Sequence, residues 1–217
     1  TRYISSEKIQ RIYNPVHLEE KIHDSPGVAQ SVHKSKLPSL VIVGLLHPGK
    51  GQMDAVLALE KLLNKGIKAR LKIVGYGVPE YLKQLKQTVV QSGVSEYVEF
   101  TGYVDDPFPI MRSADIILVC SRSEAFGRVT VEGMRCRKPV IGANSGATPE
   151  LVKGGFNGLL YEPGNHHDLA EKINYLMDHP KKAQQMGSNG FDWASKQFTI
   201  ERSASQVFDI LQEACNQ

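Results

Sequence analysis

From Leu40 onward, short apolar runs alternate with amphipathic stretches, and this alternation is compatible with few architectures. The apolar runs lie near 40–44, 70–74, 97–101, 115–120, 139–142 and 158–161, and their β-branched residues are typical of buried strands. Helical periodicity separates them near 51–65, 79–92, 106–113, 126–137, 148–153 and 166–178, with two more helices at about 180–197 and 200–214. The pattern predicts an α/β fold, a Rossmann-like parallel sheet with helices on both faces.

Composition narrows the class of protein further. The chain of 217 residues and 24.0 kDa fits one large domain or one domain with extensions. Its net charge of +3, without a dense run of Lys or Arg, is compatible with an anionic ligand or a membrane surface but does not indicate nucleic acid. The three cysteines, Cys120, Cys136 and Cys215, lack metal-ligand spacing and favour reduced, cytosolic thiols. We expect neither a membrane span nor a signal peptide at Thr1.

The stretch 121–150 contains the residues most suited to bind a ligand. It follows the buried run 116–119, opens with small polar residues and continues into a helix expected from about Phe126 to Arg137. In an open parallel sheet, ligands bind in the crevice beyond the carboxyl ends of the strands, where a helix amino terminus supplies N–H donors and partial positive charge. Two carboxylates, Glu124 and Glu132, flank this helix start.

The spacing of the two carboxylates allows two interpretations. Eight helical residues rise roughly 12 Å, about the span of a sugar, a diphosphate and a ribose. Glu124 would then address the sugar end, and Glu132 would accept hydrogen bonds from ribose hydroxyls, as acidic residues do in dinucleotide folds. Alternatively, Glu124 only stabilises the helix dipole and Glu132 is a solvated helix residue.

The sequence around these carboxylates resembles a known family. The segment Glu124-Ala-Phe-Gly-Arg-Val-Thr-Val-Glu132, followed by Lys138-Pro-Val-Ile and Ser145-Gly-Ala-Thr-Pro-Glu150, closely resembles the E-x7-E signature of retaining group 1 glycosyltransferases (family 4), which have the two-domain GT-B fold. The similarity runs from about 40 to 198 and matches only the carboxyl-terminal, donor-binding half. It implies a nucleotide-sugar-binding domain at 38–198, a linker at 1–37 to an absent acceptor domain, and a helix at 199–217 that crosses back to that domain.

The first turn, Gly44-Leu-Leu-His-Pro-Gly-Lys50, matches G-x4-G-K but has Gly51 where a P-loop requires Ser or Thr. It is more similar to the G-x-L…K-G loop of the family, in which the glycine lets the backbone approach a diphosphate and the lysine neutralises it. Many members have Arg directly after the glycine, where this chain has Leu45. Arg128, at a position that is usually apolar in the family, either compensates for that loss or faces solvent. We interpret His47 as a turn residue.

Other positions are assigned to the nucleotide by the same resemblance. Gly75 lies in a glycine turn beside the nucleotide, and Tyr103 and Val104 lie in a segment similar to F-x-G-x-V, whose backbone meets the base. Tyr103 packing over the sheet edge is an equally acceptable interpretation. The adjacent His166 and His167 point apart at a helix start, so no metal site is expected there.

The resemblance implies transfer of a sugar from a UDP- or GDP-linked donor to an acceptor with retention of configuration. Positive charge and N–H groups would stabilise the diphosphate leaving group. Lys50, the Gly44 loop and the helix start at Phe126, Gly127, Arg128 and Val129 would supply them. Glu124 and Lys50 are the expected catalytic residues, with Glu124 not a covalent nucleophile, and no metal or cofactor is expected.

The chain alone is expected to bind its nucleotide-sugar donor without appreciable transfer, because the acceptor site would lie in the absent domain. The full-length protein is expected to be cytoplasmic and peripherally associated with the inner face of the membrane. Two alternatives remain open at this point: a noncatalytic nucleotide-sugar-binding module, and a GT-B sugar-nucleotide epimerase.

Overall fold

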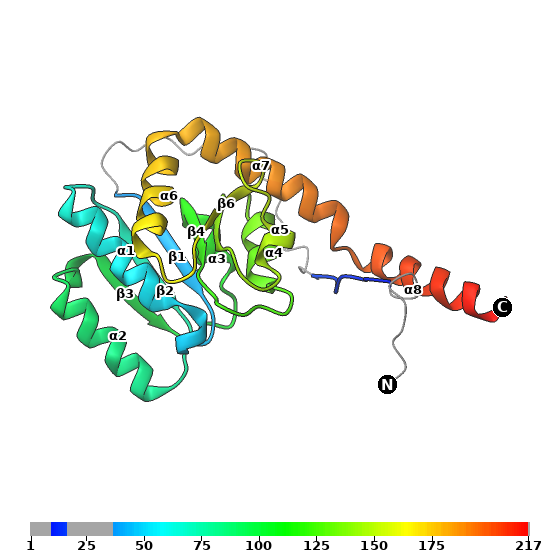
Figure 1. Cartoon of the computed structure of the whole chain (residues 1–217), viewed down its shortest axis with the longest axis horizontal. Coiled ribbons are helices and arrows are strands. Elements are labelled where there is room, and N and C mark those ends of the chain that lie inside the picture. The colour runs from blue at the N-terminus through cyan, green and yellow to red at the C-terminus, as the bar shows by residue number, and fades with distance from the viewer. Residues whose placement is uncertain (1–9, 17–36, 217) are drawn as a thin grey trace.

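The computed structural model describes residues 10–16 and 37–216 and contains one wholly parallel six-stranded sheet (Figure 1). The strand order is β3-β2-β1-β4-β5-β6, the order of dinucleotide-binding Rossmann folds. The α/β prediction and all six strand predictions are confirmed. The strands are β1 Ser39–Val43, β2 Arg70–Val74, β3 Val98–Gly102, β4 Ile116–Val119, β5 Val140–Ala143 and β6 Gly158–Tyr161.

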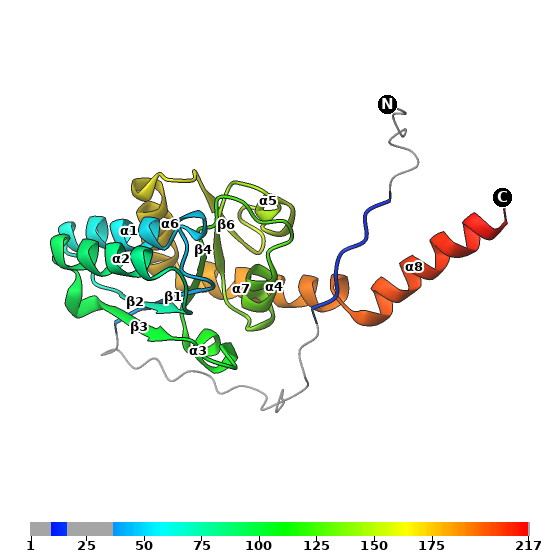
Figure 2. The same ribbon diagram turned by 90° about the horizontal axis from the view of Figure 1, so that it is seen from below.

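Helices cover both faces of the sheet (Figure 2). One face packs against α1 Gln52–Asn64, α2 Pro79–Gln91 and α6 His166–Asp178, and the other against α3 Phe108–Ser113, α4 Arg128–Arg135 and α7 Pro180–Gln197. Alternate strand residues serve the two layers: Leu40 and Ile42 join the first core, whereas Val41 between them joins the second. The short elements are η2 Pro48–Lys50, η3 Ser95–Tyr97 and α5 Thr148–Leu151.

The centre of the sheet determines where a ligand can bind. β1 pairs with β2 on one side and with β4 on the other, so the chain winds outward from this point in both directions. The segments after β1 and β4 lead to α1 and α4 on opposite faces of the sheet. At such a switch point, α/β proteins bind ligands in a crevice at the carboxyl ends of the strands. Lys50 follows β1, and Glu124 follows β4.

The boundaries of α4 differ from the sequence prediction. The helix begins at Arg128, not near Phe126, because Gly127 adopts a left-handed conformation (φ 86°) as its N-cap, and it ends at Arg135, with Arg137 at φ 57°. The prediction that a helix separates Glu124 from Glu132 along all eight residues is therefore wrong, because the helix begins only at Arg128. Similarly, α3 begins at Phe108, after the carboxylate of Asp106 accepts a hydrogen bond from the Phe108 N–H (2.9 Å).

The carboxyl-terminal helix α8, Ile200–Cys215, extends away from the sheet (Figures 1 and 2). Its apolar side chains Ile200, Val207, Phe208 and Leu211 are exposed, whereas Phe198 before it is buried. Residues 10–16 lie beside this junction: the Val16 N–H donates to the carbonyl of Phe198 (3.0 Å), and the Ser203 hydroxyl donates to that of Tyr13 (2.9 Å).

The predicted linker at 1–37 lies largely outside the described residues, and the crossing of α8 to another domain stays a prediction. Within the described ranges, no helix combines the length and the apolar character needed to cross a membrane.

Candidate functional site

The loops after β1 and β4 are joined by hydrogen bonds at the crevice. The carbonyl of Gly49 accepts from the Arg122 N–H (2.9 Å) and from the Ser121 hydroxyl (3.3 Å). Gly51 lies so close to the end of β4 that a Cβ there would be 2.1 Å from the carbonyl oxygen of Cys120. The Ser or Thr side chain that a P-loop needs at this position therefore does not fit.

The structure brings Lys50 and Glu124 together. The Lys50 Nζ lies 2.6 Å from the Glu124 Oε1, and the two side chains are 35% and 17% exposed. The loop that carries Glu124 is also tied to the loop after β5, because the Ala147 N–H donates to the carbonyl of Glu124 (2.9 Å) and the Ser145 hydroxyl donates to that of Arg122 (2.6 Å). The ion pair is thus held by three loops at one end of the sheet.

The predicted glycines Gly44 and Gly75 are in direct contact. The Gly44 N–H donates to the carbonyl of Val74 (3.0 Å), and the Gly75 N–H donates to that of Gly102 (2.8 Å). Gly75 has φ 134°, and a Cβ at this position would lie 2.0 Å from the Gly44 carbonyl oxygen. Only glycine allows the loops after β1 and β2 to approach this closely.

Tyr103 lies at the edge of the same end of the sheet and contacts a second tyrosine. It is 65% exposed, and its ring meets that of Tyr76 edge-to-face with centroids 5.5 Å apart. Its neighbour Val104 is partly buried against the core under α3 and α4. Tyr76 was not predicted from the sequence to lie at the site. The pattern that could have indicated it is an aromatic residue between the two glycines of the turn after β2.

Glu132 is almost buried, which excludes the alternative of a solvated helix residue. Its side chain is 11% exposed, and the Arg128 Nη2 lies 3.4 Å from its Oε1. Burial raises the pKa of the Glu132 carboxyl, whereas the charge of Arg128 lowers it. Arg128 itself is 72% exposed but directs its guanidinium to this carboxylate, so neither predicted interpretation of Arg128 anticipated the contact.

The remaining predicted positions, Phe126, Gly127 and Val129, lie at the start of α4. Phe126 is partly buried, with its ring centroid 6.2 Å from that of Tyr13 and 5.6 Å from that of Phe198. Gly127 is the N-cap, and Val129 packs against the core. The first N–H groups of a helix have no partner within it, so this turn presents donors at the crevice.

Asp54 is a buried carboxylate that sequence analysis missed. Its side chain is 5% exposed and accepts hydrogen bonds from the Tyr161 hydroxyl (3.1 Å) and the Gly164 N–H (3.0 Å), with the Arg122 Nη2 at 3.6 Å. It therefore connects α1 to the loops after β4 and β6. The signal was an acidic residue within the apolar face of α1, directly after the Lys-Gly turn.

The sequence predictions about histidines concern a turn at His47 and a metal site at His166 and His167. The prediction that His47 is a turn residue is confirmed, because its Nδ1 accepts from the Gly49 N–H (3.1 Å). The prediction that the His166 and His167 side chains point apart is wrong, because their rings stack with centroids 5.9 Å apart and an interplanar angle of 28°. Throughout residues 10–16 and 37–216, no group of three His, Cys, Asp or Glu side chains is arranged to hold a metal ion.

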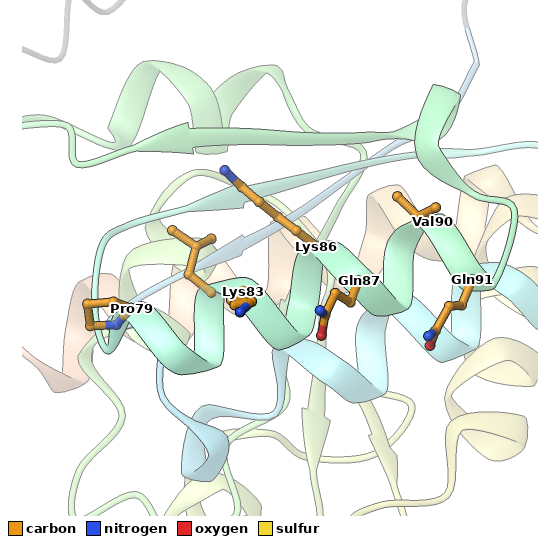
Figure 3. Close-up of a pocket in the computed structure, with 7 residues that line it drawn as sticks. Pro79, Lys83, Lys86, Gln87, Val90 and Gln91 are labelled. Carbon is orange, nitrogen blue, oxygen red and sulfur yellow. The ribbon is translucent and has the colours of Figure 1, made fainter.

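A shallow groove of about 700 Å³ lies elsewhere, along α2 (Figure 3). It is lined by polar and apolar side chains of this helix, and Lys86 extends across it toward Phe100 of β3, with 5.8 Å between the ammonium and the ring centroid. No residue of the crevice lines this groove, so we treat it as separate from the candidate site.

The family of Glycosyl transferases group 1 matches residues 28–193, which is most of the chain. This chain belongs to the family of glycosyl transferases group 1. Its sheet and helices match GT-B glycosyltransferase structures, as the resemblance implied.

Named relatives of this chain come from archaea and bacteria. An uncharacterized glycosyltransferase of Methanocaldococcus jannaschii is 35% identical over 175 residues, which are 80% of this chain and 47% of the relative. A GDP-mannose-dependent α-(1-6)-phosphatidylinositol monomannoside mannosyltransferase of Mycobacterium tuberculosis is 31% identical and covers 80% and 47%. The chain thus spans about half the length of these relatives.

Solved structures of glycosyltransferases also match this chain over part of their length or as a separate domain. An Anabaena protein, HepE, in complex with UDP superposes with a TM-score of 0.77 at 31% identity, covering 82% of this chain and 49% of HepE. The C-terminal domain of a group 1 glycosyl transferase of Francisella tularensis superposes with a TM-score of 0.68 at 28% identity, covering 77% of this chain and 90% of that domain. The chain therefore corresponds to a carboxyl-terminal domain of this family.

Proposed function

We propose that this chain is the donor-binding half of a retaining glycosyltransferase that uses a UDP- or GDP-linked sugar. The observation that carries the proposal is the Lys50–Glu124 pair at 2.6 Å, placed in the crevice between β1 and β4. Support also comes from the HepE complexes with UDP and UDP-glucose and from the GDP-mannose-dependent mycobacterial relative. These relatives differ in their nucleotide, so both bases belong to the proposal.

The chemistry of sugar transfer suits these groups. The barrier lies in separating an oxocarbenium-like sugar from a diphosphate, and positive charge at the diphosphate stabilises that separation. Lys50 supplies an ammonium, and the first turn of α4 supplies N–H groups. Glu132 receives the ribose hydroxyls, and Glu124 lies toward the donor sugar.

The acceptor site belongs to the half of the protein that precedes this domain in the proposal. The exposed apolar side chains of α8 support this arrangement, since four of them lie on one helix that projects from the sheet (Figure 2). We propose that α8 packs against that acceptor domain. Donor binding is then a property of this chain, whereas transfer requires the longer protein.

A thermal-shift screen of this chain with UDP-glucose, GDP-mannose and ADP-glucose tests the donor assignment. A ligand at 100 times its Kd stabilises the folded state by about 2.7 kcal/mol. In a domain of this size that raises Tm by about 5–10 °C. We expect such a rise with a UDP- or GDP-linked sugar, and no rise with any nucleotide sugar would contradict the proposal.

A further inference from the structure

The side chains of Arg128 and Glu132 form a pair whose members differ in exposure. Glu132 is 11% exposed, while Arg128, one helical turn earlier, is 72% exposed and reaches its carboxylate at 3.4 Å. Arg128 is the first residue of α4 and Glu132 is in the second turn, so the pair runs along the helix from its crevice end. A residue spacing of four places both side chains on one face of a helix.

An almost buried carboxylate needs a partner to stay charged. Burial favours the protonated form of Glu132, and Arg128 is the cation that opposes this effect. The thiol of Cys136 after α4 also interacts with Glu132. Burial raises the pKa of this thiol to about 12, so it adds no charge near neutral pH. Arg112 of α3 and Lys138 interact with that thiol.

The charge state of Glu132 determines which hydrogen bonds it can make. An ionised carboxylate is acceptor-only and can receive two hydroxyl groups, as a ribose presents them. A protonated carboxyl must donate through one oxygen and loses the stronger, charge-assisted bonds. A carboxylate intended for vicinal hydroxyls therefore depends on the group that keeps it ionised.

We propose that Arg128 is a positioning residue that holds the Glu132 carboxylate ionised and directed to accept the two ribose hydroxyls of a nucleoside diphosphate. The inference rests on the proposed function, because it takes a nucleotide as the ligand of the crevice. This role differs from the earlier prediction that Arg128 replaces the arginine that many family members have at the position of Leu45. Arg128 acts on the ribose through Glu132 and does not need to touch the ligand.

Calorimetric titration of the chain with UDP and with 2′,3′-dideoxy-UDP at pH 5.5 and pH 8 tests this role. The measured quantity is the ratio of the two Kd values, which reports the ribose hydroxyls alone. The terminal phosphate of both nucleotides titrates near pH 6, and the ratio cancels this effect. The variants are Arg128→Met, Arg128→Lys and, as a control on an exposed arginine of α8, Arg202→Met. If guanine nucleotides bind more tightly, GDP and its dideoxy analogue replace the uridine pair.

In the wild type and in Arg202→Met, we expect a preference for UDP of about tenfold at both pH values, the size of a charge-assisted hydrogen bond. In Arg128→Met, the preference persists at pH 8 but falls to about twofold or less at pH 5.5. Arg128→Lys keeps most of it at both pH values. A merely structural effect of Arg128 would weaken both nucleotides equally and leave the ratio unchanged.

An unchanged ratio in Arg128→Met at pH 5.5 would overturn the inference, as would a wild type without any preference for UDP. Both outcomes leave the donor-site proposal standing if Lys50→Ala weakens both nucleotides. If the wild type binds no nucleotide at all, the proposed function itself fails. Circular dichroism of Arg128→Met and Arg128→Lys checks that each variant is folded before its ratio is compared.

Discussion

At the scale of single residues, the proposed diphosphate would have to replace a contact that already exists between two side chains. Lys50 is held by Glu124 at 2.6 Å in a partly exposed ion pair. A diphosphate that approaches the Lys50 ammonium competes with this carboxylate for the same charge. Glu124 thus opposes diphosphate binding at Lys50 while lying where the proposal places the donor sugar.

We predict that Glu124→Gln binds UDP about threefold more tightly than the wild type, because partly exposed ion pairs contribute up to about 1 kcal/mol. The same change in the full-length protein lowers the rate of sugar transfer. Isothermal titration calorimetry measures the first effect, with Glu99→Gln, which breaks the surface pair with Lys72, as the matched control. A weaker affinity for UDP in Glu124→Gln would show that the carboxylate does not compete with the ligand.

The approach of the Gly75 Cα to the Gly44 carbonyl gives a second prediction. Gly75→Ala forces a Cβ against a backbone oxygen 2.0 Å away at φ 134°, and we expect the free energy of unfolding to fall by at least about 1–3 kcal/mol. Urea denaturation measures it. Gly154→Ala is the control, since a Cβ at Gly154 meets nothing within 4 Å. Equal stability of the two variants would contradict the tight contact between the loops.

Sequence patterns located the charged residues of the site but not their pairing. The resemblance selected Lys50, Glu124 and Glu132, and the structure places the first two in contact. The burial of Glu132 was not predictable from local periodicity, because it depends on neighbouring elements that pack around α4. Asp54 was missed for the same reason, since its partners Tyr161 and Gly164 are more than 100 positions away along the chain.

At the scale of elements, short runs rich in apolar and β-branched residues explain why all six strands were predicted. Strands covered on both faces read as unbroken Val, Ile and Leu segments, as in Ile116–Val119. Helix ends were less predictable because they depend on caps. The N-cap residues, the left-handed Gly127 of α4 and Pro107 of α3, each place a helix start two residues later than predicted.

The junction between α7 and α8 shows how one side chain fixes an element. Phe198 is 1% exposed, and its ring contacts those of Tyr13, Phe126 and Trp193. We predict that Phe198→Ala lowers the free energy of unfolding by about 3–5 kcal/mol. Phe208→Ala, on the exposed side of α8, should change it by less than about 0.5 kcal/mol. Similar losses in both variants by chemical denaturation would contradict this packing.

The cysteines at the ends of β4 and α4 provide a test of burial. Burial raises the pKa of both Cys120 and Cys136 to about 12, so both stay protonated and unreactive at pH 8, whereas Cys215 is exposed on α8. We predict that one thiol per chain reacts rapidly with an aromatic disulfide reagent and that Cys215→Ser removes this phase. Rapid reaction of two or three thiols in the native protein would contradict the closed core.

At the scale of the whole molecule, the chain spans about half the length of its relatives. It contains the loops that follow β1 and β4 at the centre of the sheet. Helices cover both faces of the sheet, whereas α8 projects from it with exposed apolar side chains (Figure 1). The fold was predictable because strands and helices alternate in the sequence from Leu40 onward. Where α8 packs was not, since its partner in the proposal is a different part of the protein.

The central claim is that a nucleoside diphosphate binds in the crevice through Lys50. Calorimetric titration of UDP, GDP and ADP into the wild type, Lys50→Ala and the exposed-surface control Lys65→Ala measures it directly. We predict that UDP or GDP binds the wild type and Lys65→Ala with equal affinity, and that Lys50→Ala weakens this binding about tenfold or more, the loss expected of a charged contact. Negligible binding of all three nucleotides, or an affinity unchanged by Lys50→Ala, would contradict the claim.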